Sequence, residues 1–186
     1  MSNNRSGSKS VQIAMGGVFS GLCLVIMILA PMIPFATYFM PMLAGSMLAA
    51  VVIENGAKTA VFVYVSVSLL SLFAVADREA AGMFVCFFGF YPVLKQFLER
   101  MRSRVVGYAL KLLVFNIAMV LNYLAFLYLF GIEEAAGDAE FLGKYGPLAL
   151  LGCGNLVFLM YDYLFSRYIW LYVHWFRPKF LGKQHI

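Results

Sequence analysis

Six long apolar runs dominate the sequence, and they constrain its fold more than any other feature. Each is close to the roughly 20 residues that an α-helix needs to cross about 30 Å of hydrocarbon. The runs cover residues 11–31, 37–54, 57–75, 80–98, 105–130 and 147–171. Of the 186 residues, 63% are hydrophobic and only 12% are charged, against about 25% charged in soluble domains. We therefore predict an all-α membrane protein, a bundle of six transmembrane helices.

Basic residues lie almost entirely on one side of this predicted bundle. If the N-terminus is cytoplasmic, the connections on that side carry 12 of the 14 Lys and Arg residues, and the other side carries only Arg78 and Lys144. Excess Lys and Arg mark the cytoplasmic side of a membrane protein. The basic segment from Lys95 to Lys111 is then a cytoplasmic hairpin between the fourth and fifth spans, and both termini are predicted to be cytoplasmic.

This topology sets the predicted domain organisation. Residues 1–10 form a cytoplasmic N-terminal tail, residues 11–175 the six-span membrane domain and residues 176–186 a basic cytoplasmic tail. The lipid bilayer is the first predicted partner, in the plasma membrane of a bacterial cell. The net charge of +5 is explained by the one-sided distribution of cations, so we do not expect nucleic-acid binding.

Two local signals predict where helices turn. Asn55-Gly56 lies between the second and third runs, and a glycine there suits the left-handed backbone that often ends a helix. Asp77 precedes the fourth run, where its carboxylate can cap the first turn, with Glu79 in a favourable position beside it.

Groups for catalysis are scarce. The sequence contains no Ser/His/Asp set, no HExxH motif and no phosphate-binding glycine loop. Its three cysteines are isolated inside apolar runs, without the spacing of a metal site. We predict that the protein is not an enzyme and uses no metal and no cofactor.

Charged residues within the runs are informative, because each costs about 3 kcal/mol at the centre of a membrane helix. Asp162 lies well inside the sixth run, and Lys95 and Lys111 lie at a similar depth in the fourth and fifth. We predict an intramembrane ion pair between Asp162 and one of the two lysines. It could lock three spans together, or form a coupling or partner-contact site.

Amide side chains form a second polar set. Asn116 lies near the middle of the fifth run, and Asn122 and Asn155 lie in the predicted outer halves of the fifth and sixth. Amides at this depth either join helices by hydrogen bonds or bind a ligand. Tyr123, and Tyr38 in the uncharged outer connection of residues 30–41, could complete a pocket open to the outside.

Small residues mark one face of the first run. Gly17 and Gly21 have the Gly-x-x-x-Gly spacing that allows two membrane helices to approach closely. This face could pack within the bundle or dock on another protein.

Together these features resemble the substrate-binding S components of energy-coupling-factor vitamin transporters. The resemblance is architectural: about 190 residues, six spans, a short basic N-terminus, an apolar first outer connection and small residues in the first span. It implies a small-molecule ligand in the outer half, bound by Tyr38, Asn122, Tyr123 and Asn155. It also implies a transmembrane coupling subunit and partner ATPases. S components typically dock through an Ala-x-x-x-Ala face, for which this chain has Gly17 and Gly21.

An alternative of a different class is a non-catalytic scaffold of the cell-envelope machinery, similar in size and span count to the MreD-like rod-shape proteins. Such a scaffold would use the small-residue face and the basic hairpin to hold partners. A closed cavity of about 300 Å³ or more beneath residues 31–40 would favour solute binding, and a filled bundle there would favour the scaffold.

Overall fold

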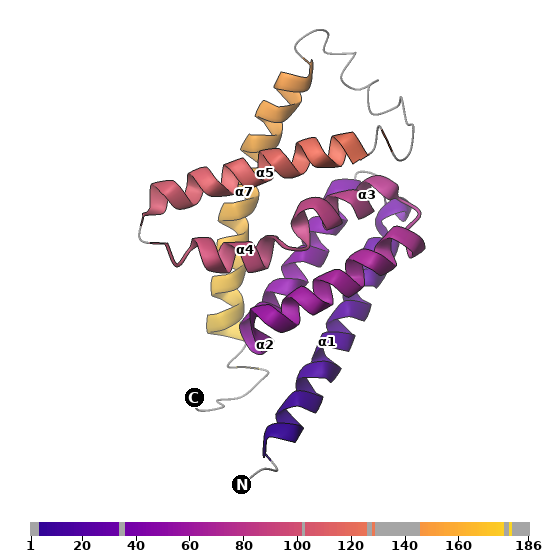
Figure 1. The fold of residues 1–186 in the computed structure, drawn as a ribbon, viewed down its shortest axis with the longest axis vertical. Helices are drawn as coiled ribbons and strands as arrows, with labels where there is room; N and C mark the ends of the chain where they lie inside the picture. Colours follow the sequence, from indigo (N-terminus) through magenta and orange to yellow (C-terminus); the bar gives the residue numbers. More distant parts are fainter. Residues whose placement is uncertain are drawn as a thin grey trace. The chain divides into compact units, whose positions relative to one another are not determined.

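The computed structural model describes residues 4–33, 36–101, 103–125, 128, 146–176 and 179. All elements in these ranges are helical (Figure 1). They are α1 (Asn4–Ile28), η1 (Ala30–Met32), α2 (Ala36–Ala74), α3 (Arg78–Met83), η2 (Phe84–Phe88), α4 (Tyr91–Leu98), α5 (Arg104–Ala125), α7 (Gly146–Leu171) and η5 (Tyr172–Phe176). The chain divides into two units, Met1–Ala136 and Gly137–Ile186, which are described separately below.

Four helices in the described ranges are long and apolar enough to cross a membrane: Ile13–Met32, Ala36–Ala74, Arg78–Leu98 and Val105–Ala125. Helices suit this setting because they satisfy their own backbone hydrogen bonds where no water is available. The all-α, membrane-compatible character predicted from the sequence is thereby confirmed. The six-span count and the location of the termini remain predictions.

The 39-residue α2 contains two of the predicted spans, because its backbone leaves the helical conformation at Gly56. This residue has φ +84° and ψ 167°, a combination that is essentially confined to glycine. The positive φ agrees with the sequence, but the ψ value is extended rather than left-handed helical. Gly56 separates a first half of α2, residues 36–55, from a second half, residues 57–74, drawn as two rods in Figure 1.

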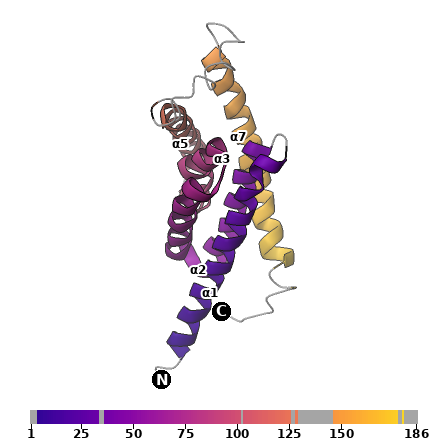
Figure 2. The ribbon, with the colours of Figure 1, turned by 90° about the vertical axis from the view of Figure 1, so that its right-hand side faces the viewer.

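Helix α1 packs against both halves of α2 (Figure 2). The Cys23 thiol donates to the Ala44 carbonyl of the first half at 3.4 Å. On the second half, Val63 lies 3.4 Å from the position that a Cβ of Gly16 would take. Gly16, Cys23 and Met27 are buried, and their spacing places them on one helical face. The face of α1 that packs within this unit therefore runs through Gly16.

The start of α2 is bonded to the start of α3 at the end opposite Gly56, which we call the Asp77 end. Thr37 Oγ1 donates to Asp77 Oδ2 at 2.8 Å, and the Tyr38 hydroxyl donates to Glu79 Oε1 at 2.9 Å. Asp77 also caps α3, because its Oδ1 accepts from the Ala80 backbone N–H at 2.9 Å, as the sequence predicts. These bonds join residues about 40 positions apart. They connect the start of α2 to the segment that follows its second half, so the two halves run antiparallel.

The predicted fourth span consists of α3, the π-helix η2 and α4. Pro92 has no N–H to donate to the Phe88 carbonyl one turn earlier, and the helix widens just before it. Gly45 of α2 lies against this carbonyl so closely that a Cβ there would overlap the Phe88 oxygen. On the other half of α2, the Tyr64 hydroxyl donates to the Val85 carbonyl at 2.7 Å. Both halves of α2 thus contact η2.

Helix α5 runs antiparallel to the α3–α4 segment. Lys111, one of its buried residues, meets Glu99 after α4, and Phe115 meets Phe87 of η2 with ring centroids 5.2 Å apart. The buried positions of α5 recur at the spacing of a single helical face and are Gly107, Lys111, Phe115, Ala118 and Asn122. From this register, Asn122 lies about 10 Å beyond Phe115, toward the Asp77 end.

The second unit is described by α7 and η5. Two hydrogen bonds lie within α7: Ser166 donates to the Asp162 carbonyl at 2.9 Å, and Arg167 donates to the Tyr163 hydroxyl at 3.2 Å. His174 stacks on Trp170 with centroids 4.8 Å apart. The helical character predicted for residues 147–171 is confirmed.

Candidate functional site

Glu99, which lies outside the predicted spans, forms ion pairs with the two lysines predicted to lie inside the membrane. Glu99 Oε1 lies 3.0 Å from Lys95 Nζ and 3.5 Å from Lys111 Nζ. Lys95 and Lys111 are buried, with 1% and 4% of their surface exposed, whereas the Glu99 side chain is 50% exposed. The i,i+4 spacing of Lys95 and Glu99 in the sequence could have predicted the first of these ion pairs. This cluster joins α4 to α5 at the end remote from Asp77.

The predicted pair between Asp162 and a lysine stays a prediction. Asp162 belongs to the second unit, and both lysines belong to the first. Within the first unit, Glu99 already provides a counter-charge for both. If Asp162 also pairs, it joins an existing ionic cluster, and replacing it will affect three charged side chains rather than one.

The three amides have different surroundings. Asn116 Nδ2 donates to the Leu112 carbonyl at 2.8 Å, and Asn155 Nδ2 donates to the Leu151 carbonyl at 2.8 Å. Asn122 is 7% exposed, and its Oδ1 has no hydrogen-bond donor among the described residues. A buried acceptor left without a donor costs about 1–3 kcal/mol. Of the amides, Asn122 therefore has the strongest requirement for a further partner.

The two tyrosines of the predicted pocket are exposed. Tyr38, 50% exposed, lies at the Asp77 end with its hydroxyl on Glu79. Tyr123 is 43% exposed and follows Asn122 on the helix, so the two project about 100° apart. The structure describes Tyr38, Asn122 and Tyr123 within the first unit and Asn155 within the second. Whether the four form one site stays a prediction.

Described residues of the connection between the first two predicted spans are buried at the Asp77 end. Ala30, Ala36 and Met40 from this connection are 0%, 3% and 8% exposed. They share one apolar cluster with Val75 and Ala80. Part of the connection is helical, since η1 covers Ala30–Met32 and α2 begins at Ala36. Pro31 lies in the first turn of η1, whereas Pro41 lies inside α2.

Gly17 and Gly21 make no close contact within the described part of the first unit. A Cβ at either position would have no atom within 4 Å among the described residues. Gly16, one residue away, is the glycine that packs on α2. The Gly-x-x-x-Gly face is therefore open to an additional element, whether from this chain or from another protein.

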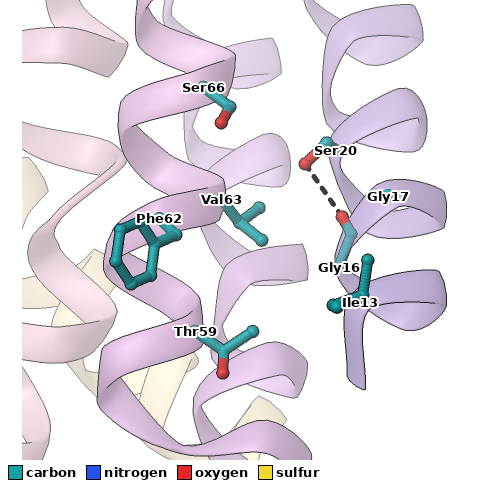
Figure 3. Close-up of a pocket in the computed structure, with 8 residues that line it drawn as sticks. All are labelled: Ile13, Gly16, Gly17, Ser20, Thr59, Phe62, Val63 and Ser66. Carbon is teal, nitrogen blue, oxygen red and sulfur yellow. Dashed lines mark hydrogen bonds between the residues drawn. The ribbon is translucent and has the colours of Figure 1, made fainter. Parts of the chain in front are cut away.

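A groove lies between α1 and the second half of α2 (Figure 3). Its volume is about 490 Å³, and it is lined by Ile13, Gly16, Gly17, Ser20, Thr59, Phe62, Val63 and Ser66. It is open along one side of the helix pair, and it lies near the Gly56 end rather than beneath residues 31–40. None of the predicted ligand-binding residues lines it.

Within the described part of the chain, no three His, Cys, Asp or Glu side chains are grouped closely enough to hold a metal ion. Comparison with protein-family models, curated proteins and solved structures finds no match to this chain.

Proposed function

We propose that this membrane protein is the solute-binding subunit of a transporter, resembling an energy-coupling-factor S component, in a bacterial plasma membrane. It captures a small vitamin-like molecule from outside the cell and relies on a transmembrane coupling subunit with partner ATPases. The sequence has no phosphate-binding glycine loop with which to hydrolyse ATP, so the energy for transport comes from the partners.

The buried Asn122 side chain carries this proposal. Its Oδ1 needs a donor that the described residues do not provide, and a solute with an N–H or O–H group would supply one. A polar group in a membrane helix is costly unless it is paired, and such groups often mark substrate pathways. The ligand class is therefore a small molecule with at least one hydrogen-bond donor.

The position of Asn122 suits capture from outside. Lys111 lies beside Glu99 at the basic end of the bundle, and Asn122 is 11 residues, or about 16 Å of helix, farther along α5. The predicted topology places the basic end in the cytoplasm. Asn122 then lies in the outer half of the membrane, on the side of the acidic Asp77 end.

Substitution of Asn122 tests the proposal. We expect protein purified from its native membrane to release a small molecule on denaturation, detectable by mass spectrometry. Replacing Asn122 with Leu should weaken its binding about ten-fold, the effect of losing one buried hydrogen bond. Asn116→Leu is the matched control, because the Asn116 amide bonds to its own helix. Equal solute in both variants, or none in the wild type, contradicts the proposal.

The burial of Ala30 and Ala36 supports a second candidate, a non-catalytic membrane scaffold of the MreD-like class. Both residues pack in the same apolar cluster as Val75, as expected of a connection that belongs to the core of a bundle. A scaffold would co-purify with envelope proteins but with no small molecule. Loss of those proteins on replacing Gly17 and Gly21 together with Leu, without loss of folded protein, would select this candidate.

A further inference from the structure

The groove between α1 and α2 has the dimensions of a site for an extended chain. Its lining residues run from Ile13 and Thr59 at one end to Ser20 and Ser66 at the other (Figure 3). Seven residues separate Ile13 from Ser20, which corresponds to about 10 Å of helix. One leaflet of a bilayer provides about 15 Å of hydrocarbon, so the groove extends over most of a leaflet.

An occupant of the groove needs few hydrogen bonds to its lining. The Ser20 hydroxyl donates to the Gly16 carbonyl at 2.8 Å, and the Thr59 hydroxyl donates to the Asn55 carbonyl at 3.2 Å. These hydroxyls are satisfied by their own helices, and the apolar side chains of Ile13, Phe62 and Val63 form much of the remaining lining. An apolar occupant can enter without leaving these donors unpaired.

The groove is open along one side, so its occupant is only partly enclosed. Gly16 and Val63 are buried beneath it, and a Cβ at Gly16 would lie 3.4 Å from the Val63 side chain. A volume of about 490 Å³ along about 10 Å of helix has room for a hydrocarbon chain.

A cation lies at one end of the groove. Lys58, which is exposed, immediately precedes the lining residue Thr59. Glu54 lies beyond the Gly56 turn and is only partly exposed. Lipid tails are equally apolar throughout the bilayer, so we expect a preference for one lipid to come from Lys58.

We propose that this groove binds one acyl chain of an anionic phospholipid, with the lipid phosphate beside Lys58. The tail lies along Gly16, Gly17 and Ser66, and the headgroup remains at the membrane surface. This lipid site is separate from the solute proposed at Asn122, because it lies near the opposite end of the bundle. The lipid would fix α1 against α2 at the place where their packing is incomplete.

Native mass spectrometry of the full chain tests the site. Protein purified in mild detergent is equilibrated with vesicles of phosphatidylglycerol or of phosphatidylcholine, and the lipid retained on each molecule is counted. We expect preferential retention of phosphatidylglycerol. Lys58→Gln should lower this preference about five-fold, the surface effect of one basic residue. Ser66→Leu should fill the groove and remove retention of both lipids.

Two glycine variants provide the matched comparison. A Cβ at Gly17 or Gly21 would meet no atom within 4 Å, so neither position obstructs the start of a side chain, yet only Gly17 lines the groove. Gly17→Leu should lose the lipid, and Gly21→Leu should keep it. Equal retention of both lipids by the wild type, or equal retention by the two glycine variants, overturns the proposal. So does unchanged lipid retention in Gly17→Leu accompanied by loss of a co-purifying membrane protein.

Discussion

Two pairs of glycines show how differently the same residue is used in this protein. Gly45 and Gly89 lie where helices touch: a Cβ at Gly45 would overlap the Phe88 carbonyl, and one at Gly89 would lie 2.5 Å from the Tyr64 ring. Gly17 and Gly21 have the recognised membrane-helix spacing, yet a Cβ there would meet nothing within 4 Å. Gly17 and Gly21, which have the motif spacing, are open, whereas Gly45 and Gly89, which belong to no motif, make the close contacts.

Close contact between helices therefore depends on the partner surface as well as on the small residue. Membrane helices associate through van der Waals packing and hydrogen bonds, since lipid gives no hydrophobic drive between them. At Gly45 the partner is a backbone carbonyl in a π-helix, and only a hydrogen fits between the two segments. A weak Cα–H···O contact of the kind found between packed helices is the expected interaction there.

Gly45→Ala should have the largest effect. The atom it would meet is backbone, which cannot rotate away, so the first half of α2 must separate from η2. We expect a loss of about 3 kcal/mol in the free energy of unfolding, at the upper end of overpacking costs. Titration from mild detergent into a denaturing one measures it. Ser46→Ala is the control, because Ser46 bonds within its own helix; equal losses in both variants would contradict a close contact at Gly45.

Gly89→Ala should cost less, about 2 kcal/mol, because part of the obstruction is a side chain. Its Cβ would meet the Tyr64 ring at 2.5 Å and 2.7 Å and the Phe84 carbonyl at 2.9 Å. Combining it with Tyr64→Leu removes the ring, and we expect the double variant to be more stable than the sum of the single losses predicts. Strict additivity in the same titration would show that Tyr64 is not the obstruction.

Gly56→Ala should cost about 1 kcal/mol, at the lower end for a residue held in sparsely populated backbone. Nothing lies within 4 Å of its Cβ position, so the cost comes from φ +84° alone. Gly56→Asn should not be better tolerated, because ψ 167° lies outside the left-handed helical region that Asn accepts. A fully stable Asn variant would instead indicate a left-handed helical turn.

Hydropathy and charge placed the helices of this chain well, because burial in lipid requires long apolar segments whatever their partners. All six predicted runs correspond to helix in the described residues, and Asp77 caps α3. The sequence could not show the π-helix at Phe84–Phe88. That geometry depends on Pro92, Gly45 and the Tyr64 hydroxyl together, and these residues come from separate segments.

Candidate site residues were harder to predict than helices, because their partners also come from separate segments of the chain. The sequence indicated that Lys95 and Lys111 lie at similar depth. It did not indicate that Glu99 pairs with both, because Glu99 lies just beyond the apolar run, in the predicted surface hairpin. It also gave no means of ranking the amides. Asn116 and Asn122 have similar apolar neighbours in sequence. Only the structure shows that Asn116 donates to its own helix, whereas the Asn122 oxygen has no donor among the residues that the structure describes.

Gly17→Ala and Gly21→Ala should have the smallest effect on the isolated chain. Because the positions are open and helical, Ala should leave the free energy of unfolding unchanged or raise it by up to about 1 kcal/mol through helix propensity. A loss as large as that at Gly45 would show that these glycines already pack against a helix of this chain. If the stability is kept but assembly with a coupling subunit or another membrane protein is weakened, the open face is where that partner docks. Gly45 and Gly89 would then be needed for folding, and Gly17 and Gly21 for assembly with the partner.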